Sequence, residues 1–267
     1  MAPDRAPGFA PAKINLTLHV TGRRADGYHL LDSIVAFADL GDVLTVAPGD
    51  GLMVDGPFAA GVPTGEANLV RRALALADAS RHVMLTKNLP HPGGIGGGSS
   101  DAAAALRLVG ARLDTDALLA LGADLPVCMV ARAARMSGIG ETIQPLDLPP
   151  LHSVLIHPGL AAPTGAVFAA LKRVDHTGHG ALPSFADADR LTDWLGGQRN
   201  DLEPAALRVA PGIADVLAAL RDHGAQLARM SGSGATCFGL WPDRAAADAA
   251  AAALDRRGWW VRAATLR

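Results

Sequence analysis

Cysteine is scarce in this chain of 267 residues, and its charges almost cancel. The only two cysteines, Cys128 and Cys237, lie far apart in apolar runs, so no disulfide framework is expected and a reducing compartment is favoured. Lys and Arg number 24 against 26 Asp and Glu, which leaves a net charge of −2. No basic field would gather nucleic acid or an anionic membrane, and we expect neither partner.

Long hydrophobic runs are also missing. No apolar stretch reaches the roughly 18 residues that a membrane-spanning helix needs, and residues 1–13 lack the apolar core of a secretory signal. Hydrophobic residues nevertheless make up 49% of the chain and charged residues 19%, a balance typical of a globular protein. We therefore expect a soluble cytoplasmic protein whose core needs no disulfide or metal.

The apolar pattern predicts strands and helices mixed without regular alternation. Residues 13–20 alternate between polar and apolar, which predicts a strand with one solvent-facing side. A turn is expected at residues 39–42. A second apolar stretch covers residues 30–40. The other expected strands are 43–46, 82–86, 153–157, 235–240 and 259–263, and the expected helices are 68–79, 100–109, 116–121, 205–208, 213–223 and 243–256. Prolines at 149 and 150 mark the best boundary, so we predict an α+β fold in two halves.

Glycine is concentrated in two blocks, residues 93–98 and 231–234. The first block follows a predicted strand and directly precedes a predicted helix, where free N–H groups and the helix dipole attract anions. Gly98 is followed by Ser99 and Ser100, so the block is neither a Walker A loop, which needs Lys after its last glycine, nor a Rossmann fingerprint, which needs glycine at position 99. We predict a loop that cradles a triphosphate, with a tightly packed turn as the alternative.

Three further segments could carry chemistry, each with a simpler alternative. Lys13 and Asn15 project from one face of the first strand and could hold an anion or alkoxide, or form a solvated strand face. Asp124, two residues before a proline, could be a base but is more typical of a helix cap. Tyr28, the only tyrosine, precedes His29 on a loop and could stack on a base or sugar, or pack on the surface.

Two other patterns favour ordinary structural roles. His176 and His179 are three residues apart without a cysteine or acidic residue at ligand spacing, which predicts a solvated loop rather than a metal site. Ser233 lacks the glycine two residues before it that a nucleophile elbow needs, so an α/β-hydrolase is not expected.

Together these motifs resemble the GHMP superfamily of small-molecule kinases and, within it, the family of 4-diphosphocytidyl-2-C-methyl-D-erythritol kinases. The resemblance runs nearly from end to end. It is found in residues 11–16, 24–29, 89–103, 122–126, 200–201 and 230–235. The glycine loop is common to the superfamily, whereas the Lys-x-Asn and Asp-Gly-Tyr-His elements are much more specific to this family.

The resemblance implies a two-domain GHMP kinase fold, with an N-terminal ATP-binding domain over residues 1–148 and a smaller C-terminal α/β-sandwich domain over 149–267. It implies transfer of a phosphoryl group from ATP, with Mg²⁺, to the 2-hydroxyl of 4-diphosphocytidyl-2-C-methyl-D-erythritol in non-mevalonate isoprenoid synthesis. Asp124 would be the general base, and Lys13 would stabilise the alkoxide and keep Asp124 ionised. The motifs do not assign the metal ligands. We expect a monomer or a weak homodimer.

The family's binding residues map onto this sequence in two groups. The ATP-binding residues would be Asn68 at the adenine and the loop residues Pro90, His91, Pro92, Gly93, Gly94, Ile95, Gly96, Gly97, Gly98, Ser99 and Ser100. The substrate-binding residues would be Asn15, Tyr28, His29, Thr164 and Phe168. Among these, Asn15 would orient the hydroxyls, Tyr28 and His29 would hold the cytosine, and Phe168 would be the opposite stacking face.

Three departures from the family pattern leave these residues in place. His91-Pro92 stands where relatives more often have a small residue and glycine, so the loop entrance is stiffer and lacks one N–H donor. The helix before Gly122 is shorter than usual, and Val127-Cys128 replaces a frequent aromatic pair.

Two alternative functions are also compatible with a glycine loop that binds a nucleotide. One is a sibling kinase acting on homoserine, mevalonate or a sugar, against which Tyr28 and His29 argue. The other is a nucleotide-binding regulator without transfer chemistry, against which the presence of both Lys13 and Asp124 argues.

Overall fold

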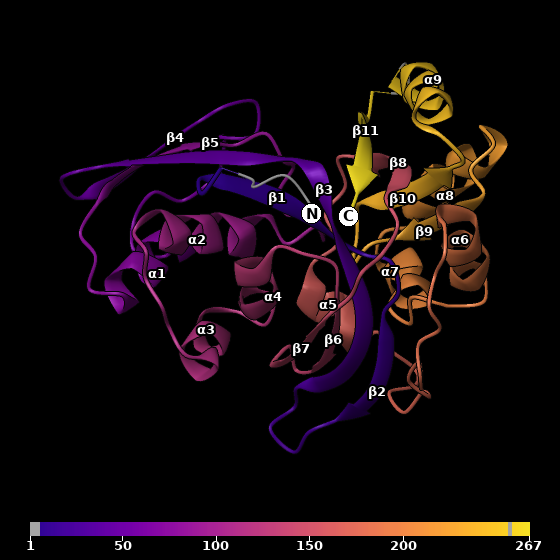
Figure 1. Ribbon diagram of the computed structural model, residues 1–267, viewed down its shortest axis with the longest axis horizontal. Coiled ribbons are helices and arrows are strands. Elements are labelled where there is room, and N and C mark those ends of the chain that lie inside the picture. Colours follow the sequence, from indigo (N-terminus) through magenta and orange to yellow (C-terminus); the bar gives the residue numbers. More distant parts are fainter. Residues whose placement is uncertain (1–5, 256–257) are drawn as a thin grey trace. The chain divides into compact units, whose positions relative to one another are not determined.

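The structure, a computed structural model that describes residues 6–255 and 258–267, contains two compact units (Figure 1). Unit 1 comprises the described residues up to 13 together with 40–91 and 96–131, and unit 2 comprises 14–39, 92–95 and the described residues from 132 onward. Each unit combines a sheet with helices, as the predicted α+β class requires.

The two units are interleaved in sequence. Strand β3 (His29–Ala47) contributes its first half to unit 2 and its second half to unit 1, and β1 (Phe9–Asn15) changes unit after Lys13. A single cut at residue 148 therefore does not separate the compact units. The division into 1–148 and 149–267 concerns the sequence motifs and stays a prediction.

In unit 1, helices pack on a small sheet. The second half of β3 pairs antiparallel with β5 (His82–Thr86), which pairs in parallel with β4 (Gly51–Asp55). The helices are α1 (Leu69–Leu76), α2 (Gly97–Leu108), α3 (Thr115–Leu121) and α4 (Leu125–Val130). Figure 1 shows α1 and α2 running along one side of these strands, and the alanines of α2 are buried, which lets this helix lie close to its neighbours.

In unit 2, two groups of strands meet at β3. Strands β2 (His19–Arg23) and β6 (Ala134–Gly138) pair antiparallel with its first half, and β7 (Thr142–Pro145) pairs with β6. The remaining strands follow in the order β11 (Trp260–Leu266), β8 (Leu151–His157), β10 (Cys237–Trp241) and β9 (Leu227–Met230). The helices are α5 (Thr164–Ala169), α6 (Ala188–Gly196), α7 (Glu203–Val209), α8 (Ile213–Asp222) and α9 (Arg244–Leu254).

Several predicted elements are confirmed. Strand β5 has the predicted ends, and α1 begins after Asn68, whose side-chain oxygen accepts the Val70 N–H at 2.8 Å. Strands β4, β6, β7 and β9 and helices α4, α5 and α6 were not predicted. Residue 256, the predicted end of the last helix, lies outside the described residues. None of the described helices is long and apolar enough to cross a bilayer.

The predicted turn at residues 39–42 is wrong, because β3 continues through it. Gly41 lies so close to β1 that a Cβ there would be 2.3 Å from the Ala10 carbonyl oxygen. Asp42 is buried and accepts the backbone N–H groups of Asn88 and Leu89 at 2.6 and 2.8 Å. Gly41 and Asp42 are residue types that are common in turns. Here the glycine lets β3 pack closely on β1, and the aspartate holds the backbone at residues 88 and 89.

The predicted solvent-facing side of residues 13–20 is also wrong. Strand β1 ends at Asn15 and β2 begins at His19, and the polar residues at positions 13, 15, 17 and 19 are as buried as the apolar ones. Thr17, for example, accepts the Ile34 N–H at 2.9 Å through its hydroxyl. The alternating pattern correctly indicates a polar face on residues 13–19. That face is buried because residues distant in sequence pack against it and form hydrogen bonds with it.

Candidate active site

Lys13 and Asp124 form an ion pair in unit 1. The Lys13 ammonium donates to Asp124 Oδ1 at 2.9 Å. Asp124 occupies the N-cap position of α4, yet its side chain makes no capping bond. Lys13 is only 3% exposed, whereas the Asp124 side chain is 32% exposed. The pair therefore combines a buried cation with a carboxylate that a bound hydroxyl can reach.

The glycine loop reaches this pair through Gly96. A Cβ at Gly96 would lie 3.2 Å from Lys13 Cβ and 3.7 Å from Asp124 Oδ2, and the residue has a φ of +64°, which favours glycine. Gly96 is also the N-cap of α2, and no side chain caps that helix. The first turn of α2 therefore starts beside the ion pair, and the N–H groups at a helix N-terminus are of the kind that binds anions.

A buried charge cluster, which the sequence analysis missed, lies beneath the same loop. Lys87 forms ion pairs with Asp42 and with Asp101, the latter at 2.7 Å, and all three side chains are buried. A Cβ on Gly97 would be 3.2 Å from the Lys87 ammonium nitrogen. Burial raises the pKa of Asp101, although Lys87 opposes this. The sequence signal for this cluster was Asp101, a carboxylate among the alanines of a predicted helix, which indicates a buried cationic partner.

Ser100 faces the interior rather than a ligand. It is fully buried, and its hydroxyl donates to the Pro11 carbonyl at 2.7 Å. This bond ties α2 to β1. The Ser100 N–H donates to the Gly96 carbonyl at 2.8 Å, and the predicted contact of Ser100 with ATP stays a prediction. Ser99 is partly exposed, and its hydroxyl lies 3.7 Å from the position that a Cβ on Gly122 would take.

The other predicted ATP residues of unit 1 have structural partners. The Asn68 side chain caps α1 and also donates to the Pro63 carbonyl at 2.7 Å. His91 Nε2 lies 3.1 Å from the Phe58 carbonyl oxygen, and Pro90 is buried. Their contacts with ATP stay predictions.

In unit 2, two of the predicted substrate residues contact each other. The His29 and Phe168 rings stack with centroids 4.8 Å apart and planes inclined by 26°. Burial, aided by Arg23, lowers the pKa of His29 and favours its neutral ring. Tyr28 is 60% exposed at the end of its turn, so its ring is open to a base. Because His29 and Phe168 already touch, a base could enter between them only if they parted.

Asn15 and Thr164 are held by serines of the second glycine block. The Asn15 N–H donates to the Ser231 hydroxyl at 3.0 Å, and its side-chain amide donates to Ser33 at 2.8 Å. The Thr164 and Ser233 hydroxyls lie 2.8 Å apart. Asn15 is 1% exposed, and these hydrogen bonds fix the orientation of its side chain. Its role toward substrate hydroxyls stays a prediction.

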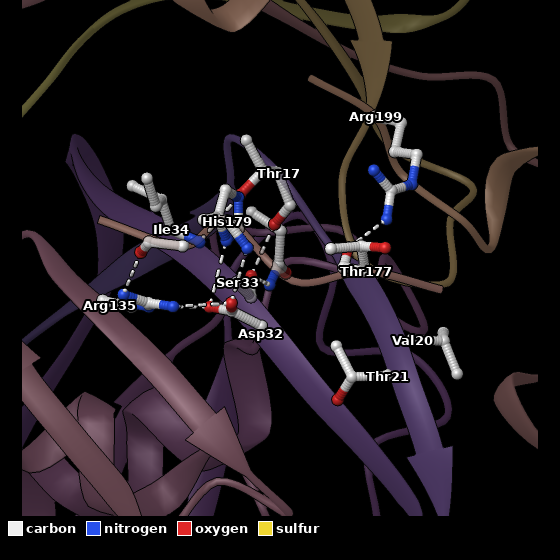
Figure 2. Close-up of polar contacts among 12 residues, drawn as sticks. Thr17, Val20, Thr21, Asp32, Ser33, Ile34, Arg135, Thr177, His179 and Arg199 are labelled. Atoms are coloured by element: carbon white, nitrogen blue, oxygen red, sulfur yellow. Dashed lines mark hydrogen bonds and ion pairs between the residues drawn. The ribbon is translucent and has the colours of Figure 1, made fainter. Parts of the chain in front are cut away.

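The expectation of a solvated loop at His176 and His179 is wrong for His179. Its buried ring stacks on His19 at 3.9 Å, and its backbone N–H donates to Asp32 at 2.8 Å. Arg135 donates twice to the same carboxylate at 2.8 Å, and Figure 2 shows dashed lines from both residues to Asp32. Burial raises the pKa of Asp32, but these donors outweigh it and hold the pKa well below its usual range.

Neither a metal cluster nor a disulfide accompanies these sites in residues 6–255 and 258–267. Within those ranges no group of three or more His, Cys, Asp or Glu side chains could hold a metal ion. Both cysteines are buried free thiols.

Comparison with known proteins identifies the family. The model of the GHMP kinase N-terminal domain matches residues 67–139, and that of the C-terminal domain matches 169–259. A protein of Paracoccus denitrificans named 4-diphosphocytidyl-2-C-methyl-D-erythritol kinase is 55% identical over 262 residues, which cover 96% of this chain and 95% of the relative. This chain belongs to the 4-diphosphocytidyl-2-C-methyl-D-erythritol kinase family.

Other relatives of this family agree. The Dinoroseobacter shibae protein of the same name is 55% identical and covers 100% of this chain and 97% of its own. A crystal structure titled 4-(cytidine 5'-diphospho)-2C-methyl-D-erythritol kinase superposes with a TM-score of 0.77 at 36% identity, covering 97% of this chain and 98% of that one. The expected family, GHMP kinase fold and phosphotransferase class are confirmed, and GHMP kinase membership implies ATP-dependent phosphorylation of a small molecule.

A more distant neighbour shows the fold alone. Mevalonate kinase of L. major superposes with a TM-score of 0.66 at 14% identity, covering 97% of this chain. The architecture is thus shared with sibling kinases, so the substrate must be argued from the family match and from individual residues.

Proposed function

We propose that this protein phosphorylates the 2-hydroxyl of 4-diphosphocytidyl-2-C-methyl-D-erythritol with ATP, in non-mevalonate isoprenoid synthesis. The observation that carries the proposal is the Lys13–Asp124 pair beside Gly96, in a chain that matches this family over nearly its full length. The Tyr28, His29 and Phe168 side chains of unit 2 support a cytidyl substrate over homoserine, mevalonate or a sugar.

The chemistry follows from the pair. Asp124 removes the proton from the 2-hydroxyl as that oxygen forms its bond to the γ-phosphorus, and the bond from the γ-phosphorus to the bridging oxygen of ADP breaks. Lys13 donates a hydrogen bond to the Asp124 carboxylate before the step and stabilises the alkoxide oxygen during it. The N–H groups at the start of α2 bind the phosphate oxygens and spread their charge. A nucleotide-binding regulator would need neither side chain of the pair.

Mg²⁺ is expected to arrive with the nucleotide. Magnesium commonly binds substrate phosphates and water with one or two carboxylates rather than a protein cage, and the described residues offer no cluster that would form a cage. This chemistry fits Mg²⁺ carried on the ATP phosphates, where it would neutralise charge, and we assign no protein ligand to it. The cytoplasmic location and the monomeric or weakly dimeric state stay predictions.

Release of ADP by the purified protein tests the proposal. The panel of acceptors is the cytidyl substrate, homoserine, mevalonate and galactose, each with ATP and Mg²⁺. We expect turnover with the cytidyl substrate alone. Turnover with another acceptor would identify a sibling kinase, and nucleotide binding without turnover on any acceptor would identify a regulator.

A further inference from the structure

Three consecutive carbonyl groups of the glycine loop accept hydrogen bonds from other segments of unit 2. His157 Nε2 lies 3.2 Å from the Pro92 carbonyl oxygen. The Thr236 N–H donates to the Gly93 carbonyl at 3.2 Å, and the Ser231 hydroxyl donates to the Gly94 carbonyl at 3.2 Å. Every peptide from residue 92 to 95 is therefore held by its oxygen.

Holding a carbonyl also aims the next N–H group. In a trans peptide the C=O of one residue and the N–H of the following residue point in opposite directions. The bond from His157 to Pro92 thus turns the Gly93 N–H away from His157. The bonds to Gly93 and Gly94 do the same for the two N–H groups that follow.

The tautomer of His157 follows from its second contact. Its Nδ1 accepts the Gly159 N–H at 3.1 Å, so that nitrogen carries no proton. In the neutral ring the proton is then on Nε2, which must donate to Pro92. His157 is 7% exposed, and this burial lowers its pKa and favours the neutral ring.

The hydrogen bond between His157 and the Pro92 carbonyl, here called the His157 anchor, is important because residue 92 is a proline. Proline has no N–H to offer a phosphate, and its ring fixes φ, so the carbonyl is the only backbone group through which Pro92 can be held by a hydrogen bond. The Gly93 N–H is then the first donor after the entrance, and its direction depends on the peptide that His157 holds.

We propose that His157 is a positioning residue for the nucleotide: its Nε2–H fixes the Pro92 carbonyl and thereby directs the Gly93 N–H toward a phosphate of ATP. The inference rests on the proposed ATP-dependent function, in which this loop binds phosphate. His157 itself touches neither nucleotide nor acceptor in this role.

Two amide variants separate positioning from a merely structural role. His157→Asn places its oxygen where Nδ1 stands and can keep the Gly159 N–H bond, but it is too short to reach Pro92. His157→Gln places an amide N–H near Nε2 and can keep the Pro92 bond. We expect His157→Asn to weaken ADP binding and raise the KM for ATP by about 3- to 10-fold, the loss of one hydrogen bond, with a smaller change in kcat. His157→Gln should restore most of that loss.

The reverse order would overturn the inference. If His157 served only the turn at Gly159, the His157→Asn variant would bind ADP like the wild type, and the His157→Gln variant would bind ADP more weakly. Calorimetry with ADP needs no acceptor, so this result does not depend on which alcohol is phosphorylated. The proposed function fails by a different observation, the absence of ADP release by the wild type with the cytidyl substrate.

Discussion

Lys13 and Asp124 are joined by a 2.9 Å hydrogen bond although 111 residues separate them in sequence. Strand β1 delivers the ammonium to the interior, and the start of α4 delivers the carboxylate to a partly exposed position. An Asp at an N-cap normally bonds to the free N–H groups of its helix. The side chain of Asp124 makes no such bond and instead accepts from Lys13 through Oδ1. Because the side chain is partly exposed, the carboxylate can still accept a proton from a bound hydroxyl.

Replacing Asp124 should abolish proton removal without disturbing the nucleotide. Asp124→Asn keeps the shape and cannot accept the proton, so kcat should fall by about 10²–10⁴-fold with the Kd for ADP nearly unchanged. Steady-state kinetics and calorimetry measure the two quantities. Near-normal turnover would remove Asp124 from the mechanism.

Lys13 should act with Asp124 as one unit. Lys13→Met should lower kcat strongly, and the double variant Lys13→Met with Asp124→Asn should lose less than the product of the two single losses. Strictly multiplicative losses would mean that the two side chains contribute independently.

Adjacent glycines of α2 should respond differently to substitution. Gly97→Val would place its side chain against the buried Lys87 ammonium, so we expect weaker ATP binding and a lower Tm. Gly98→Ala is the matched control, because its Cβ would meet nothing within 4 Å, and alanine favours a helix over glycine. Its Tm should equal or exceed that of the wild type. Tight ATP binding by a folded Gly97→Val protein would place the phosphate site elsewhere.

The exposed ring of Tyr28 should contribute to binding of the cytidyl group. Tyr28→Ala should weaken CMP binding by about 5- to 150-fold, the loss of one stacking contact of about 1–3 kcal/mol. Tyr28→Phe keeps the ring face and should lose little. ADP affinity should be unchanged in both variants, and equal CMP affinity in all three proteins would contradict the stacking role.

Acid should destabilise the fold through His19. Burial, aided by His179 and Arg199, lowers the pKa of His19 from 6.5 to about 3, and Asp32 opposes this only in part. The unfolded chain therefore binds a proton that the folded one excludes, so stability is lost as pH falls from 6.5 toward 3, at up to about 1.4 kcal/mol per pH unit.

A matched variant isolates this effect. His19→Phe keeps a ring to stack on His179 and removes the titrating group, so denaturant unfolding between pH 6.5 and 4 should show a shallower slope. His29 and His157 also have lowered pKa values and remain in both proteins, which makes the difference in slope specific to His19. Identical slopes would show that His19 does not titrate in this range.

Features determined by neighbouring residues could be predicted from the sequence. The Asn68 cap, β5 and the glycine loop before α2 each depend on neighbours within a few positions. Helix α2 follows from the same local chemistry, and the phosphate site at its start stays a prediction.

Features determined by distant partners could not be predicted. Lys13 and His19 look solvent-facing until Asp124 and His179 cover them, and Asp42 looks like a turn residue until it accepts N–H groups from Asn88 and Leu89. The His157 anchor also escaped detection, because 65 residues separate it from Pro92.

The interleaving of the two units sets an order of events during synthesis. Unit 1 is complete once residue 131 has left the ribosome, whereas residues 14–39 must wait for the chain from residue 132 onward to complete unit 2. At about 5–20 residues per second, translation of residues 132–267, after unit 1 is complete, takes roughly 7–27 s. Until the end of that interval the first half of β3 lacks the partner that β11 will provide. A nascent chain of this protein thus presents an unpaired strand edge to chaperones after every residue of unit 1 has been made.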